Sequence, residues 1–134
     1  MTPSEESLVH AGLKLLSHEI YLNATSHGFY DEEFKDYLVT GESGVLFPVS
    51  LTPVFKAKRI ALITSELSEA LEGIRKPHPD QHCPEFSNEE IELADAIIRI
   101  LDYGVAYNLK LTEAIFAKMK FNESRSKMHG GKAF

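Results

Sequence analysis

Apolar residues recur with helical spacing in four segments of the chain, and turn-forming residues separate these segments. The first segment runs from Ser4, which can cap a helix, to about His27, where Gly28 gives a stop signal. The second runs from Thr52 to about Arg75 and has proline next to its start, a position that helices tolerate. The pattern therefore predicts two long helices in the first half of the chain.

The second half of the chain predicts two more helices. The third begins with the capping box Ser87-Asn-Glu-Glu90 and runs to about Tyr107, and the fourth is capped by Thr112 and reaches roughly Lys127. Residues 40–52 contain two glycines and a proline and show no strand alternation, so we expect a connection there. The predicted fold is all-α, a bundle of four to five helices.

Two helices show how the bundle is expected to pack. About 100° of rotation per residue places one stripe of the second helix toward the core. This stripe consists of Ile60, Ile63, Leu67, Leu71 and Ile74. The third helix, over residues 87–107, is apolar around more than half of its circumference, so we expect a second subunit to cover part of it.

Length, charge and cysteine content restrict the class of protein. The 134 residues suit one domain spanning 1–134. A net charge of −6 argues against a nucleic-acid partner bound through a broad basic surface. The single cysteine, Cys83, cannot form an internal disulfide, and we find neither a membrane span nor a signal peptide. These observations predict a cytoplasmic protein with no membrane partner.

Two acidic couplets stand out within the predicted second and third helices. Glu66 and Glu69 are three residues apart, as are Glu92 and Asp95, so each pair projects from one side of its helix. If the two helices pack together, four carboxylates surround one point, and such a site suits a hard divalent cation. Either couplet by itself is more typical of solvated helix surface than of a metal site.

The ordered set of motifs resembles the MazG-like, all-α nucleoside triphosphate pyrophosphohydrolases. A Glu-x-x-Glu couplet is followed after 22 residues by Glu-x-x-Asp, and the helical segments 59–72 and 92–100 around them look like the metal-binding helices of that family. Further similar segments are Lys118-x-x-x-Asn122-x-x-Arg125, the tail at 129–132, and Asn23 with residues 27–31 at the end of the first helix. The resemblance covers nearly the whole chain.

This resemblance implies Mg²⁺-dependent hydrolysis of a nucleoside or deoxynucleoside triphosphate to the monophosphate and pyrophosphate, in clearance of the nucleotide pool. The metal, with Mn²⁺ as a possible substitute, would be held by Glu66, Glu69, Glu92 and Asp95. Glu69 is also the candidate for orienting the attacking water. The implied substrate-binding residues are Lys118, Asn122, Arg125, Asn23, Phe29 and Lys132. The expected assembly is a homodimer or homotetramer.

Two other functions remain open at this stage. The first is a pyrophosphohydrolase acting on a metabolite such as phosphoribosyl-ATP, and the second is a non-catalytic helical oligomerisation or regulatory module with the same fold. A zinc site at His78, His82 and Cys83 is disfavoured because these residues lack a paired second cluster. The chain has no Gly-x-x-x-x-Gly-Lys loop, which excludes a P-loop NTPase.

Overall fold

The computed structural model describes residues 1–125 and contains four helices and one small sheet. The elements in chain order are α1 (Pro3–Ser26), β1 (Tyr37–Thr40), β2 (Leu46–Val49), α2 (Thr52–Arg75), α3 (Asn88–Ala106) and α4 (Leu111–Glu123). The predicted all-α class is confirmed. None of the helices in the described part of the chain is both long and apolar enough to cross a membrane.

Capping boxes begin two of the helices. Ser87 and Glu90 bond reciprocally at the start of α3, as the sequence predicts. At the start of α1 the cap is Thr2, not the predicted Ser4, because Thr2 forms its own capping box with Glu5. Pro3 then occupies the first turn, where backbone N–H groups have no partner within the helix, so the lack of an N–H in proline costs no hydrogen bond.

The predicted bounds of the fourth helix are wrong at both ends. Thr112 lies inside α4 and is buried, while Lys110 occupies the cap position without a side-chain hydrogen bond. The helix ends at Glu123 rather than near Lys127, and the latter lies outside the described residues. The other two helices match their predicted bounds within one residue.

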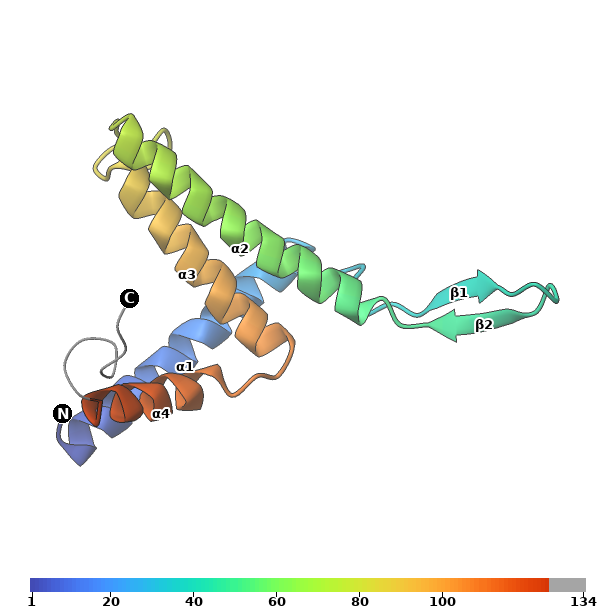
Figure 1. The fold of residues 1–134 in the computed structure, drawn as a ribbon, viewed down its shortest axis with the longest axis horizontal. Helices are drawn as coiled ribbons and strands as arrows, with labels where there is room; N and C mark the ends of the chain where they lie inside the picture. Colours follow the sequence, from blue (N-terminus) through green and yellow to red (C-terminus); the bar gives the residue numbers. More distant parts are fainter. Residues whose placement is uncertain (126–134) are drawn as a thin grey trace.

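The connection before α2 contains a β-hairpin that the sequence analysis missed. Strands β1 and β2 pair antiparallel from Tyr37 opposite Val49 to Thr40 opposite Leu46, and Gly44 in the turn has a φ of +77°. The hairpin extends away from the helices as an arm (Figure 1). Each strand has only four residues, too few for alternation to be recognised, and Pro48 is tolerated because both strands are edge strands.

Helices α2 and α3 run antiparallel side by side and form the centre of the molecule (Figure 1). α1 packs against α3, and α4 lies beside α1. Small residues line the α2–α3 contact: a Cβ on Gly73 would lie 2.9 Å from the backbone nitrogen of Glu89, and Ala70 and Ala96 are buried nearby. The two helices therefore approach closely because their facing residues are small.

The predicted core stripe of α2 is largely wrong for the single chain. Only Ile63 of its five members is buried, and the other four are about half exposed. The side of α2 that meets α3 is instead formed by Arg59, Ile63, Glu66, Ala70 and Gly73. Polar and small residues thus occupy the inner side, and the large aliphatic residues project outward.

The tight contact at Gly73 leads to a matched pair of substitutions. Gly73→Ala should destabilise the fold by about 1–3 kcal/mol, because the added methyl overlaps the α3 backbone. Gly12→Ala, within α1, meets nothing within 4 Å and should stabilise by about 0.5–1 kcal/mol through helix propensity. Urea unfolding followed by circular dichroism measures both. Equal effects of the two substitutions would contradict the close approach of α2 and α3.

Candidate metal centre and adjoining cavity

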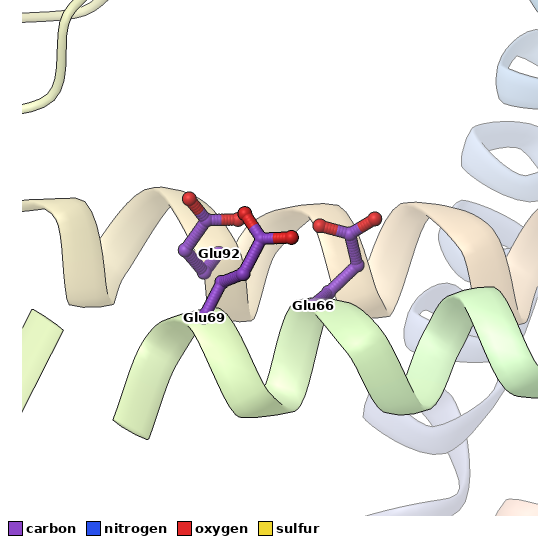
Figure 2. A group of neighbouring side chains, drawn as sticks. All are labelled: Glu66, Glu69 and Glu92. Atoms are coloured by element: carbon purple, nitrogen blue, oxygen red, sulfur yellow. The ribbon is translucent and has the colours of Figure 1, made fainter. Parts of the chain in front are cut away.

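Three of the four predicted metal-binding carboxylates come together between α2 and α3. Glu66 and Glu69 project from α2 and Glu92 from α3, and a carboxylate oxygen of each lies within 4.8 Å of those of the other two (Figure 2). Glu66 and Glu92 are buried, whereas Glu69 is exposed. The helical spacing thus correctly predicted that carboxylates of both couplets meet across the α2–α3 contact, although three of the expected four form the group.

Asp95, the fourth predicted ligand, borders this cluster. It follows Glu92 by one turn of α3 and lines the adjoining cavity. Partial burial raises the pKa of the Asp95 carboxyl, and the charge of Glu66 raises it further, while Arg99 acts in the opposite direction. Asp95 therefore shares the electrostatic environment of the cluster, although it does not belong to the group of three.

The cluster holds negative charge in a partly desolvated place. Burial raises the pKa of Glu92, and the charge of Glu69 together with the hydrogen bond and charge of Glu66 adds to this effect. A set of carboxylate oxygens that repel one another fits a hard divalent cation, which would relieve the repulsion and accept these ligands. The donor set is thus chemically suited to Mg²⁺ or Mn²⁺.

Arg99 is a charged neighbour of the cluster whose role the sequence analysis missed. Its Nε lies 2.6 Å from Glu66 Oε1, which joins α3 to α2, but the pair is not aligned as a hydrogen bond. Arg99 follows Asp95 by four residues and so lies on the same side of α3. That spacing was the available signal for a positively charged side chain beside the acidic couplets.

A cavity of about 810 Å³ opens next to the carboxylates. Asp95 and Arg99 line the end of the cavity nearest the cluster, and Asn23 of α1 and Phe29 after it form part of the opposite wall. The structure therefore places two of the predicted substrate-binding residues, Asn23 and Phe29, around one cavity with a predicted metal ligand. The volume is within the range of small-molecule sites.

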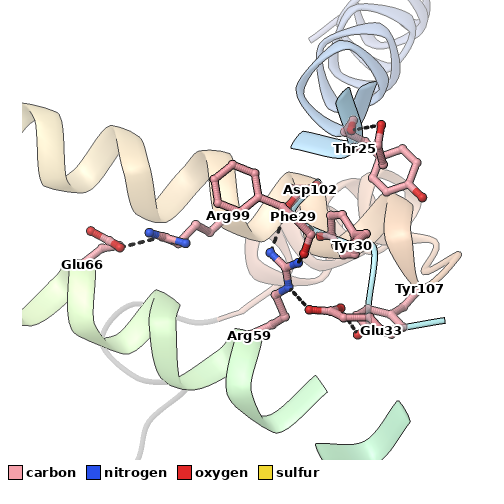
Figure 3. Close-up of polar contacts among 10 residues, drawn as sticks. Thr25, Phe29, Tyr30, Glu33, Arg59, Glu66, Arg99, Asp102 and Tyr107 are labelled. Atoms are coloured by element: carbon pink, nitrogen blue, oxygen red, sulfur yellow. Dashed lines mark hydrogen bonds and ion pairs between the residues drawn. The ribbon is translucent and has the colours of Figure 1, made fainter. Parts of the chain in front are cut away.

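A buried polar network around Arg59 fixes the wall that contains Phe29 (Figure 3). Arg59 Nε donates to Glu33 Oε1 at 2.7 Å, and Nη2 donates to the Phe29 carbonyl at 2.5 Å. The guanidinium also lies 3.9 Å from the ring centroid of Tyr30, and Tyr107 donates to Glu33 Oε2 at 2.6 Å. These contacts hold the segment after α1 against α2 and α3.

Sequence reasoning did not detect this network, although one signal was present. Arg59 precedes Ile63 and Glu66 with spacings of four and three, so it belongs to the inner side of α2. A charged residue on the inner side of a helix requires a buried partner, which is supplied here by Glu33. Glu33 lies outside the predicted helices, so its proximity depends on tertiary structure.

Asp102 lines the cavity from α3. Its Oδ2 accepts a 2.6 Å hydrogen bond from Tyr30, while its Oδ1 is buried without a hydrogen-bond partner among residues 1–125. Burial raises the pKa of Asp102, although the Tyr30 hydrogen bond and the charge of Arg59 oppose this shift. A second acidic group with a raised pKa therefore lies on the cavity wall beside Asp95.

The predicted phosphate-binding residues of the fourth helix lie elsewhere in the single chain. Lys118 and Asn122 are exposed on α4 and Arg125 follows it, and none of the three lines the cavity. Lys118 Nζ lies instead 4.6 Å from the ring centroid of Phe121. Lys132 lies outside the described residues. The phosphate-binding role of these residues stays a prediction.

Comparison of the chain with protein-family models, curated proteins and solved structures gives no match. The resemblance to the MazG-like pyrophosphohydrolases therefore stays a prediction. The geometry provides evidence of a different kind. Within residues 1–125, Glu66, Glu69 and Glu92 form the one cluster able to supply three ligands to a metal ion, and neither histidine nor cysteine belongs to it.

The raised pKa of Glu92 predicts that Glu92→Gln stabilises the metal-free protein at neutral pH. A raised carboxyl pKa means that the protonated form favours the fold, and this stability is lost as pH rises through the raised value. The amide removes that loss, so the melting temperature at neutral pH should rise. Differential scanning calorimetry over a pH series should show the gain shrinking as pH falls into the carboxyl range.

Glu90→Gln on the same helix is the matched control with the opposite sign. Its pKa is lowered by hydrogen bonds from the backbone and side chain of Ser87, so its ionised form favours the fold. This contribution is present above the ordinary carboxyl pKa and is lost as pH falls through the lowered value. Glu90→Gln should therefore lower the melting temperature at neutral pH. A decrease in both variants would contradict the proposed repulsion around Glu92.

Proposed function

We propose that the protein is a divalent-cation-dependent hydrolase that splits a nucleoside or deoxynucleoside triphosphate into the monophosphate and pyrophosphate. The main supporting observation is the cluster of Glu66, Glu69 and Glu92, whose oxygens lie within 4.8 Å of one another. Beside the cluster is a cavity of about 810 Å³ that Asp95 also lines. Carboxylates that could bind a cation and a cavity that could hold a nucleotide are thus adjacent.

Glu66, Glu69, Glu92 and Asp95 would hold the cation. When bound, a divalent cation would offset the charge of the triphosphate and lower the pKa of a coordinated water. The buried pair Glu66 and Glu92 has little freedom to move, because each lies between two packed helices. The exposed Glu69 is more accessible to solvent and is the proposed group that orients the attacking water and accepts its proton.

The proposed reaction transfers a phosphoryl group to water and needs no nucleophilic side chain. The water oxygen bonds to a phosphorus of the α–β anhydride, the bond from that phosphorus to the bridging oxygen breaks, and the departing group keeps the electron pair. The water proton passes to the carboxylate of Glu69. Positioning and charge stabilisation supply most of the rate enhancement in reactions of this class.

Arg99 provides the nearest positive charge for this chemistry. It lines the cavity and contacts Glu66, so it lies where the cluster and the cavity meet. Arginine can bind phosphate oxygens through two N–H groups at once. We propose that Arg99 pairs with Glu66 in the free protein and with a substrate phosphate once a cation has taken its place beside that carboxylate.

The cavity wall supplies contacts for the remainder of the nucleotide. Phe29 is largely exposed and presents a ring on which a base can stack, and Asn23 offers an amide that can both donate and accept. Their backbone positions are fixed by the end of α1 and by the Arg59 hydrogen bond to the Phe29 carbonyl. The proposed base-binding region is therefore rigidly connected to the two helices that hold the carboxylates.

The direct test is hydrolysis of a panel of canonical and modified nucleoside triphosphates with Mg²⁺. We expect the wild-type protein to release monophosphate and pyrophosphate in equal amounts. In Glu69→Gln, which loses the proton acceptor, kcat should fall by about 10²–10⁴-fold. Glu72→Gln is the matched control, because Glu72 lies on the same helix but is exposed and pairs with Arg75. Release of orthophosphate, or no turnover on any substrate, would contradict the proposal. Including phosphoribosyl-ATP in the panel tests the metabolite alternative.

Metal binding can be measured separately from turnover. Titration of the protein with Mn²⁺, followed by electron paramagnetic resonance, should show binding that Glu69→Gln weakens by about 10–100-fold and Glu72→Gln leaves unchanged. Mn²⁺ binding in the absence of substrate would show a metal site even if the protein turned over no nucleotide, whereas a non-catalytic scaffold would bind no Mn²⁺. Equal Mn²⁺ affinity in both variants would exclude Glu69 as a ligand.

A further inference from the structure

Asp102 has an unused hydrogen-bond acceptor in the wall of the cavity. The residue belongs to α3 and is only 6% exposed. Its Oδ2 accepts a hydrogen bond from Tyr30, but its Oδ1 is buried and has no partner within residues 1–125. A buried acceptor without a donor is uncommon, because it has lost its water without gaining a hydrogen bond. A ligand that donates to Oδ1 would remove this cost.

A ligand can approach this carboxylate from the cavity, because Asp102 is one of the residues that line it. Since Oδ1 is buried in the free chain, binding requires the carboxylate to turn about its Cβ–Cγ bond. This torsion of aspartate has broad minima, so a small turn costs little. The Tyr30 hydroxyl can turn with the carboxylate and keep its hydrogen bond to Oδ2.

The group that Asp102 can recognise is a hydrogen-bond donor. Burial raises the pKa of this carboxyl, but the Tyr30 hydrogen bond and the charge of Arg59, whose Nη1 lies 3.7 Å from Oδ2, favour the ionised form. An ionised carboxylate only accepts hydrogen bonds. A carbonyl oxygen of a ligand against Oδ1 would leave two acceptors facing each other. Asp102 therefore favours an N–H or O–H over a C=O at this point of the cavity.

The position of Asp102 along α3 indicates which part of a nucleotide it meets. Asp95 and Asp102 are seven residues apart, which places them on one side of the helix and about 10 Å apart along its axis. Asp95 and Arg99 line the cavity next to the carboxylate cluster, where the proposed function places the phosphates. Asp102 then lies toward the far end of the nucleotide, where the base presents the edge opposite its bond to the sugar.

Arg59 holds Asp102 and Phe29 in a fixed relation to each other (Figure 3). Its Nη2 donates to the Phe29 carbonyl at 2.5 Å, and its Nη1 lies 3.7 Å from Asp102 Oδ2. Phe29 lines the same cavity and is 62% exposed, so its ring is available for stacking. One guanidinium thus positions an aromatic ring for the face of a base and an acceptor for its edge. Proteins read unpaired bases by this combination of stacking and edge contacts.

We propose that Asp102 determines base specificity and selects nucleotides whose base has an amino group at its far edge, cytosine or adenine, over those with a carbonyl there. The amino groups of cytosine and adenine donate, whereas the corresponding oxygens of uracil, thymine and guanine only accept. Aspartate accepting from the cytosine amino group is a pairing also used in DNA recognition. This inference rests on the proposed function for the placement of the phosphates, and it adds a base preference that the hydrolysis reaction alone does not specify.

Isothermal titration calorimetry of the full chain with Mg²⁺ and α,β-imido analogues of nucleoside triphosphates, which cannot be cleaved at that bridge, tests the proposal. We expect the CTP analogue to bind roughly 10–100-fold more tightly than the UTP analogue, and the ATP analogue than the ITP analogue. Asp102→Asn should bring both ratios close to one, because an amide can either donate or accept. Glu19→Gln, at an exposed carboxylate of α1 that lines the same cavity, is the matched control and should keep the ratios.

The titrations separate this proposal from the hydrolase proposal. Preferential binding of the CTP and ATP analogues, without hydrolysis of any natural triphosphate, would support the role of Asp102 and contradict the activity. Hydrolysis of CTP and UTP with equal kcat/KM would overturn the role of Asp102 and leave the activity intact. Absence of binding by all four analogues would overturn the role of Asp102 as well.

A modified ligand covers the case in which Asp102→Asn unfolds the chain, which circular dichroism would show. The N4,N4-dimethyl derivative of the CTP analogue keeps the nitrogen of cytosine but has no N–H, so the wild-type protein should bind it no more tightly than the UTP analogue. Binding as tight as that of the unmodified CTP analogue would refute the hydrogen bond to Asp102. Equal affinities for the CTP and UTP analogues, together with a preference for ribose over deoxyribose, would place the donor on the sugar and also refute it.

Discussion

The close antiparallel contact of α2 and α3 is the constraint on which the rest of the structure depends. Gly73 permits it, because a Cβ there would lie 2.9 Å from the backbone nitrogen of Glu89. Because the inner residues are small, the helices lie too close together to accommodate most of the large aliphatic side chains, which project outward. Glu66 and Glu92 are buried between the helices. The same contact that creates the acidic cluster therefore also leaves the large aliphatic residues of α2 about half exposed.

Charge inside this contact is only partly compensated. Arg59 has a buried partner in Glu33 and donates to a backbone carbonyl, so the charge of this arginine is compensated within the fold. The cluster around Glu92 differs, because burial and the charges of Glu69 and Glu66 raise the pKa of Glu92, while Arg99 lies against Glu66 on one side of the cluster. The contrast between a compensated arginine and a cluster of like charges is typical of a binding site rather than of a structural core.

The sequence predicted those features that depend on spacing within one helix. The couplets and the capping box at Ser87 could be located because helical periodicity fixes which side chains share a side. The hairpin was missed because its four-residue strands are too short to show alternation. The partner of Arg59 and the location of α4 depend on contacts between distant segments, which helical spacing within one segment does not specify. The core stripe of α2 was misassigned for a related reason: periodicity finds an apolar stripe but does not tell what covers it.

The aliphatic stripe of α2 and the acidic cluster have a common origin in the helical repeat. On α2, Leu67 follows the buried Glu66 by one residue and is turned away from α3, whereas Glu69 follows it by three and is turned the other way, toward Glu92. A single helix that packs through its small and polar side therefore carries exposed aliphatic residues on one flank and carboxylates on the other.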